Sequence, residues 1–169
     1  MFKNFLLLLL LSSNFIFSQK GFKDWDTNYK YKNVAEIIQS EIDYAKEVEK
    51  DKTEGNYYVA MHKFRFLAEF TGRERKIDAE VLNSMKRVFK IKTGSFEVLN
   101  NLISRELEFN IGNSKIWMPI QNNLIEAFKE EVKLNKKVLL YSLFTNEHKF
   151  EGGIINVFLI SEFSSDWTN

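Results

Sequence analysis

The chain has 169 residues, no cysteine, one proline, 16 phenylalanines and a formal net charge of +1. The absence of cysteine excludes thiol catalysis and thiolate metal sites, and the balanced charge argues against nucleic acid as the main partner. Many large apolar residues and few glycines indicate an ordered globular protein of one domain or two small lobes.

Residues 1–19 predict a secretory signal peptide. Lys3 precedes the apolar run Leu6–Leu11, and Ser18 stands before the polar Gln19. This order of charge, apolar run and small residue is typical of a leader, and the run is shorter than the roughly 20 residues that span a bilayer. We therefore expect cleavage near residue 19 and export to the periplasm or the medium. An uncleaved membrane tether is the alternative, and without cysteine a lipoprotein anchor is excluded.

The region from residue 20 to 94 is predicted to be predominantly helical, after an aromatic lead-in over 21–32. A first helix starts at Asn33, which we expect to be its N-cap. A second helix is expected to end at Gly94. Their apolar residues recur three or four positions apart, as one helix face requires. They are Val34, Ile37, Ile38, Ile42, Ala45 and Val48 in the first helix, and Ile77, Val81, Met85, Val88 and Phe89 in the second.

Residues 57–70 fit two patterns. As a helix they place Tyr57, Met61 and Phe64 on one stripe. As a strand they place Tyr58, Phe64 and Phe66 on one face, which His62 interrupts. We favour the helix because alanine, methionine, lysine, leucine and glutamate are good helix formers.

The region from residue 95 to 169 is predicted to be mainly β-structure. After a short helical stretch at 96–103, two strands at 106–111 and 115–120 are joined by a turn through Gly112. A helix begins at Asn122 or Asn123, with Leu124, Ile125, Phe128 and Val132 on its apolar side. A strand at 136–145, a polar loop at 146–153 and a last strand at 154–163 follow.

This order predicts an α+β fold in which N-terminal helices precede a small, mostly antiparallel barrel or sheet. One further strand, around residues 88–92, would complete a five-stranded barrel of the oligonucleotide/oligosaccharide-binding (OB) type. A non-barrel sheet with one helix across a face is the alternative.

Three segments within residues 104–163 resemble a pattern found in other proteins. The segments Trp117–Gln121, Leu139–Tyr141 and Phe158–Phe163 resemble a pattern in small exported bacterial proteins with a barrel-like C-terminal domain. The resemblance implies a fold and no active site.

Carboxylates are the main candidates for chemistry. Glu106 and Glu108 alternate onto one face of a predicted strand, and glycoside hydrolysis needs a pair of facing acids. His148 lies near Glu147 and Glu151, a possible acid/base or metal group. Each pattern is more often a solvated surface, and His62 fits a boundary position better than a ligand. We therefore assign no catalytic residue, metal site or cofactor.

Aromatic and basic residues give weaker candidates for binding. Trp117 and Tyr141 lie on predicted strands of a fold that stacks bases or sugars, although a structural role fits them better. Trp25 and Trp167, near the chain ends, are candidates for exposed contacts. Residues 63–92 hold nine basic and four acidic side chains. Such a stretch is usually a solvated face or is matched by acids elsewhere, and an anion-binding or membrane-surface role is the alternative.

The sequence thus predicts an exported, non-catalytic binding or structural module of the cell envelope, with an unknown protein or glycan as partner. The alternative function is a carboxylate-dependent hydrolase that acts on envelope glycans. No ligand-binding residue and no oligomeric state follow from the sequence.

Overall fold

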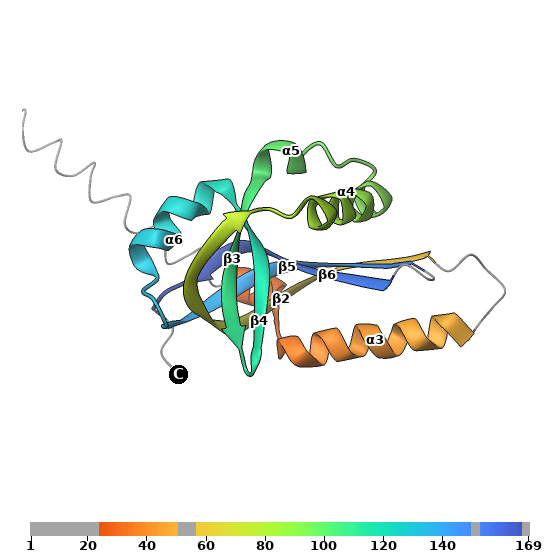
Figure 1. The fold of residues 1–169 in the computed structure, drawn as a ribbon, viewed down its shortest axis with the longest axis horizontal. Helices are drawn as coiled ribbons and strands as arrows, with labels where there is room; N and C mark the ends of the chain where they lie inside the picture. The colour runs from red at the N-terminus through yellow and green to blue at the C-terminus, as the bar shows by residue number, and fades with distance from the viewer. Residues whose placement is uncertain (1–23, 51–56, 150–152, 167–169) are drawn as a thin grey trace, which may run out of the picture.

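Five strands of a six-stranded sheet close into a ring. The computed structural model describes residues 24–50, 57–149 and 153–166, and the predicted leader and Trp167 lie outside these ranges. The sheet order is β1-β2-β3-β4-β6-β5, and an additional pairing of β2 with β5 closes the ring (Figure 1). Neighbouring strands are antiparallel except for β1 with β2 and β4 with β6. The protein is therefore a mixed α/β fold.

The strand β2 (Tyr57–Lys76) occupies the segment for which we favoured a helix, and that prediction is wrong. Its first part pairs with β5 (Lys137–Lys149) without a shift of register from Tyr57 to Glu69. Phe64 and Phe66 are thereby buried on one face. The free energy gained from burial and cross-strand pairing outweighs the modest helix propensities of the alanine, methionine, lysine, leucine and glutamate residues in this segment.

A shift of register interrupts β2 just beyond the point where its pairing with β5 ends and its pairing with β3 begins. It pairs with β3 (Ile103–Ile111) at Glu69 and Phe70 and, after a shift of register, again from Glu74 to Lys76. Gly72 lies in this shift with φ 81°, a left-handed conformation that glycine adopts without strain. A Cβ at Gly72 would lie 2.5 Å from Leu134 Cδ1. The left-handed backbone at this shift therefore favours glycine.

The other two predicted N-terminal helices are present. α3 spans Val34–Lys50, and α4 spans Ala79–Thr93. Asp78 caps α4 by accepting hydrogen bonds from the amides of Glu80 and Val81, and Gly94 ends it in a left-handed conformation. The predicted strand at 88–92 is wrong because these residues belong to α4. The missing fifth strand of the ring is β2, so the sheet includes strands on both sides of residue 94.

The C-terminal elements largely follow the prediction. The hairpin of β3 and β4 (Ser114–Gln121) is confirmed, as is the helical segment made of η1 (Asn122–Leu124) and α6 (Ile125–Glu131). The short helix α5 spans Leu99–Leu102, and the last strand β6 spans Gly153–Ser164. The predicted loop at 146–153 is too long because β5 continues to Lys149. Asn146, Glu147 and His148 are polar but buried.

Two apolar clusters hold the layers together. The first fills the ring and includes Phe66, Phe109, Phe128 and Phe158, with Val34 and Ile37 of α3 at its margin. The second joins Met85 and Phe89 of α4 to Val157 and Leu159 of β6. In Figure 1 the long ends of β2, β5 and β6 project from the ring, and α4 and α3 lie on opposite faces of this extension.

Within the described ranges, none of the helices combines the length and the apolar character that a membrane crossing requires.

Candidate functional site

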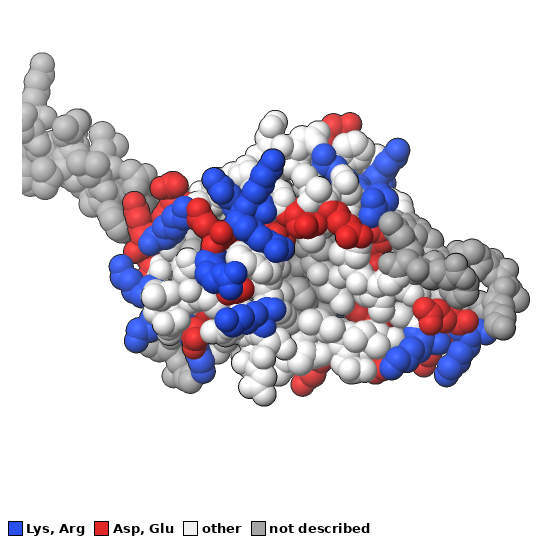
Figure 2. Space-filling view, in the orientation of Figure 1, with Lys and Arg blue, Asp and Glu red and all other residues white. Residues whose placement is uncertain are grey.

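The basic stretch at 63–92 is largely matched by acids from other segments. All four of its arginines form ion pairs with acids outside the stretch. The pairs are Arg65–Asp26 at 2.9 Å, Arg73–Glu108 at 3.1 Å, Arg75–Glu106 at 2.7 Å and Arg87–Glu147 at 2.5 Å. In Figure 2, blue and red side chains accordingly lie side by side over much of the left half of the surface. The arginines therefore fasten segments together, as the matched-charge interpretation expects.

Glu106 and Glu108 lie on one face of β3, as their alternation predicts. Both are almost fully buried. Glu106 accepts hydrogen bonds from Arg75 Nε and the Asp78 amide, and Glu108 accepts one from Thr71 Oγ1. The two acids stand beside each other on one strand, each held by an arginine, and do not face each other across a cleft. This geometry differs from the paired acids of a glycosidase.

Trp117 of β4 lies directly opposite Glu108 in the hairpin. The guanidinium carbons of Arg73 and Arg75 lie 5.4 Å and 4.4 Å from the centre of its ring. These distances are those of cation–π contacts. Trp117 therefore supports the two arginines that hold the buried glutamates, which is a structural role.

The remaining candidate acid/base groups point to opposite sides of β5. Glu147 is fully buried and forms a two-point ion pair with Arg87 of α4. His148, the next residue, faces α3 instead, and its Nε2 lies 3.0 Å from Glu49. Glu151 lies outside the described residues. The structure thus separates His148 and Glu147, because successive side chains of a strand alternate between its faces.

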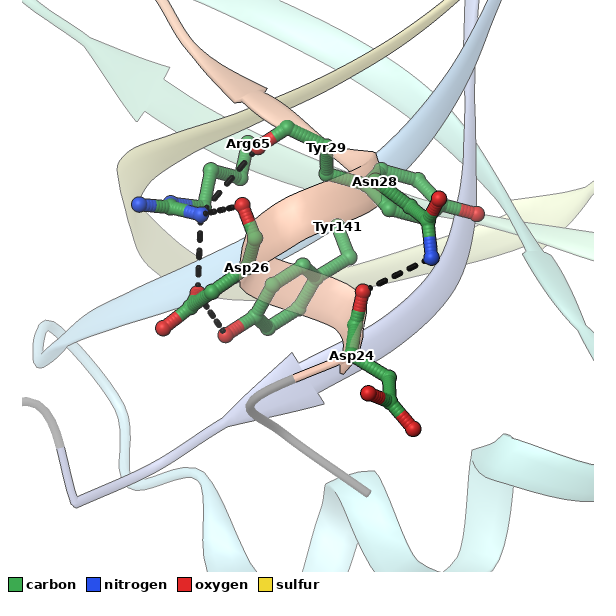
Figure 3. A network of polar contacts seen from close by, with 6 residues as sticks. All are labelled: Asp24, Asp26, Asn28, Tyr29, Arg65 and Tyr141. Carbon is green, nitrogen blue, oxygen red and sulfur yellow. Dashed lines mark hydrogen bonds and ion pairs between the residues drawn. The ribbon is translucent and has the colours of Figure 1, made fainter. Parts of the chain in front are cut away.

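The lead-in is fastened to the ring by a polar network (Figure 3). Residues 24–28 form a helical turn, and β1 (Lys30–Tyr31) follows it. Asp26 accepts a hydrogen bond from Tyr141 and pairs with Arg65, which also donates to the carbonyls of Asp26 and Tyr29. Burial, together with Asp26, raises the pKa of Tyr141 well above its usual value. Trp25 and Tyr29 each pack edge-to-face against Tyr141 and contact each other at a tilt, so Trp25 and Tyr141 have structural roles.

Four lysines surround His62 and, unlike the arginines, are not fastened to acids by the described ion pairs. Lys30 of β1, Lys32, Lys63 of β2 and Lys92 of α4 lie around His62. Among the described residues, no ion pair joins these lysines to an acid. Partial burial and the charges of Lys92, Lys30 and Lys32 lower the pKa of His62. The surroundings of His62 are therefore electropositive, and we call these four lysines and the cavity beside them the lysine groove.

The cavity of the lysine groove has a volume of about 400 Å³ and lies beside β2. Its lining combines basic and apolar groups, namely Asn28, Lys30, Met61, His62, Lys63, Phe64 and Leu143. Lys63 Nζ is placed 5.6 Å from the centre of the Tyr29 ring, and Lys32 Nζ lies 5.9 Å from that of Phe64. The groove can thus offer ammonium groups and apolar contacts to an acidic ligand.

A second cavity of about 440 Å³ lies on the other side of β1. Lys32, Lys137 and Glu69 contribute charges of both signs to its lining. The side-chain amide of Asn110 donates a hydrogen bond of 3.1 Å to the carboxylate of Glu69. With its mixed charge, this cavity favours no single class of ligand.

Sequence reasoning did not identify the lysine groove. Its lysines come from the lead-in, from β2 and from the end of α4, and no local motif joins them. Two signals pointed towards it: the basic stretch at 63–92, which contains Lys63 and Lys92 and for which anion binding was the alternative, and His62, the polar residue that interrupts the apolar face of β2.

Within the described residues, no three His, Asp or Glu side chains come together as a metal site would require. No family model, curated protein or solved structure matches the chain.

Proposed function

We propose that the protein is an exported binding module of the cell envelope that holds an acidic ligand in the lysine groove. The observation that carries this proposal is the meeting of Lys30, His62 and Lys63 at one cavity, without an ion pair from these lysines to any described acid. Unmatched positive charge beside apolar surface attracts and retains anionic partners. The arginines next to it are already occupied by acids and serve the fold.

We also propose that the ring is a barrel of the OB type. When the five strands are numbered along the chain from β2, their order around the ring is 1-2-3-5-4, and the fourth pairs with the first. The helix α6 lies between the third and fourth of them, and the third and fifth are parallel. The OB fold has five strands in a partly open Greek-key barrel, and its second and third strands commonly form a binding face. Here that face carries Trp117 beneath Arg73 and Arg75. It is therefore the alternative to the lysine groove as a binding site.

Export rests on the leader pattern at residues 1–19 and remains a proposal. Sequencing the N-terminus of the protein from its native host tests it, and a mature protein that still begins at Met1 would contradict it.

Charge reversal tests the lysine groove. The double variant Lys30→Glu/Lys63→Glu should bind poly-L-glutamate and polygalacturonate at least about tenfold more weakly than the wild type, because two local attractions become repulsions. Added salt should weaken wild-type binding, since exposed charges are screened. Isothermal titration calorimetry at low salt provides the affinities.

The matched control is Lys115→Glu/Lys133→Glu, which changes the net charge equally at two exposed positions away from the groove. It should retain most of the binding. Equal losses in the two double variants would mean that only the total charge matters, and the assignment of the site would fail.

Binding should also depend on pH through His62. In the ligand-free protein, partial burial and three lysines lower the pKa of His62. An acidic ligand offsets the lysines and raises this pKa, so binding takes up a proton. Affinity for poly-L-glutamate should therefore increase as the pH falls from about 7.5 to about 5.5, around the ordinary histidine pKa of about 6.5. The variant His62→Gln should lose this dependence, and an identical slope in both proteins would refute the coupling.

A further inference from the structure

The edge of β2 that faces away from β5 is open next to the lysine groove. On this edge β1 pairs only with Phe64 and Arg65, and β3 pairs only from Glu69 onward. In the described part of the chain, no strand pairs with this edge at residues 58–63. His62 and Lys63 are accordingly exposed although they lie in the middle of a long strand.

The backbone of β2 defines which groups this edge presents. Arg65 points its carbonyl towards β1, where it accepts from the Lys32 amide at 3.1 Å. Phe70 points the other way, since its amide donates to the Lys136 carbonyl at 3.3 Å. Backbone directions alternate along a strand, and the register with β5 is unbroken from Tyr57 to Glu69. The amides and carbonyls of Val59, Met61 and Lys63 therefore point to the open edge.

The short strand β1 demonstrates that this edge accepts a strand. It runs parallel to β2 for two residues. Towards its N-terminus the chain leaves the edge, because residues 24–28 form the helical turn that Arg65 and Tyr141 hold. The cavity of the lysine groove lies at the N-terminal end of β1 and has Asn28 and Lys30 in its lining. It occupies the place that a longer β1 would fill.

We propose that an extended, acidic segment of a partner protein adds to β2 as a strand at residues 58–63. This inference rests on the proposed function and specifies its ligand. Six residues of strand span roughly 20 Å, and an added strand would satisfy the alternating backbone groups that β2 presents there.

Two features of the edge select this partner. The lysines favour acidic side chains, while they oppose the approach of a second copy of the same edge, which would bring like charges together. A polysaccharide could satisfy the lysines, but it lacks the regular series of amides and carbonyls that the edge of a strand pairs with. The open backbone of β2 therefore favours a peptide.

Amide hydrogen exchange of the protein provides the first test. The probe is a capped octapeptide of alternating glutamate and valine, and polygalacturonate is the comparison ligand. With the peptide, exchange at the amides of Val59, Met61 and Lys63 should slow, whereas Ala60 and His62 already donate towards β5 and should change little. Polygalacturonate should bind without protecting these three amides.

Two variants of one residue provide the second test. Lys63→Ala removes the charge and the contact with Tyr29 but keeps the backbone amide. Lys63→Pro also removes that amide, which points to the open edge, where proline is tolerated. The peptide should bind Lys63→Pro about tenfold more weakly than Lys63→Ala, the effect of one lost hydrogen bond. Amide spectra would establish that both variants fold, and the exchange test on the wild type needs no variant.

The outcomes separate the two proposals. Protection of the three amides together with a larger loss in Lys63→Pro supports strand addition. Peptide binding with neither effect would overturn strand addition and leave the acidic-ligand function standing. If neither the peptide nor polygalacturonate binds, both proposals are wrong. The lysines would then serve only to prevent aggregation at this edge.

Discussion

Replacement of Arg87 by alanine should lower the free energy of unfolding by about 3–5 kcal/mol, the range found when a buried ion pair loses one partner. The side chain of Glu147 is 0% exposed and that of Arg87 39% exposed, and two hydrogen bonds of 2.5 Å and 2.7 Å join them. Without the guanidinium, the carboxylate of Glu147 must stay buried without its two-point partner or take up a proton. The linkage between α4 and β5 should weaken accordingly. Urea unfolding followed by circular dichroism measures the loss.

A surface pair provides the control for Arg87. Lys46 and Asp43 are 3.5 Å apart on α3, and their side chains are 63% and 59% exposed. Lys46→Ala should therefore cost less than about 1 kcal/mol, as is usual for exposed pairs. The double variant Arg87→Leu/Glu147→Met should regain much of the lost stability, because it removes both charges. Similar losses in Arg87→Ala and Lys46→Ala would contradict the structural role of the buried pair.

Replacement of Phe128 by alanine should cost about 3–5 kcal/mol, the usual range for a large aromatic side chain in a core. Phe128 lies on α6 and is fully buried at the end of the ring. Its ring centre lies 5.2 Å from that of Phe70, 5.9 Å from Phe109 and 5.0 Å from Phe163. Alanine would leave a cavity among three strands and release α6 from them. The same urea titration provides the free energy.

Phe128→Leu is the matched variant, since leucine fills most of the space and keeps the site apolar. It should cost clearly less than Phe128→Ala. If the two substitutions had equally small effects, α6 would contribute little to the ring, and the described core would be contradicted.

Local patterns were sufficient to predict part of this fold. The hairpin of β3 and β4 follows from strict alternation around Gly112, which has φ 58° in its turn. The alternation also placed Glu106 and Glu108 on one face correctly. The same logic could have located their partners, because Arg73 and Arg75 are likewise two residues apart. A helix at residues 57–70 gives no reason to expect a strand at Arg73 and Arg75, so their pairing with the two glutamates does not follow from it.

The rest depended on contacts between distant segments. β2 is a strand because β5 pairs with it from a position about 80 residues away, which propensity within a short window does not register. The lysine groove depends on the same pairing and on β1, which brings Lys30 beside Phe64. Its lysines form no ion pair with a described acid, whereas the neighbouring Arg65 pairs with Asp26. None of these relations is visible in the linear sequence.

Amide NMR shifts recorded during titration with poly-L-glutamate should locate the binding site at the lysine groove. We expect the largest shift changes on residues 28–32 and 58–64 and only small changes on β3 and β4. Changes centred on Trp117 and its neighbours in β3 and β4, with the lysine groove unaffected, would contradict it.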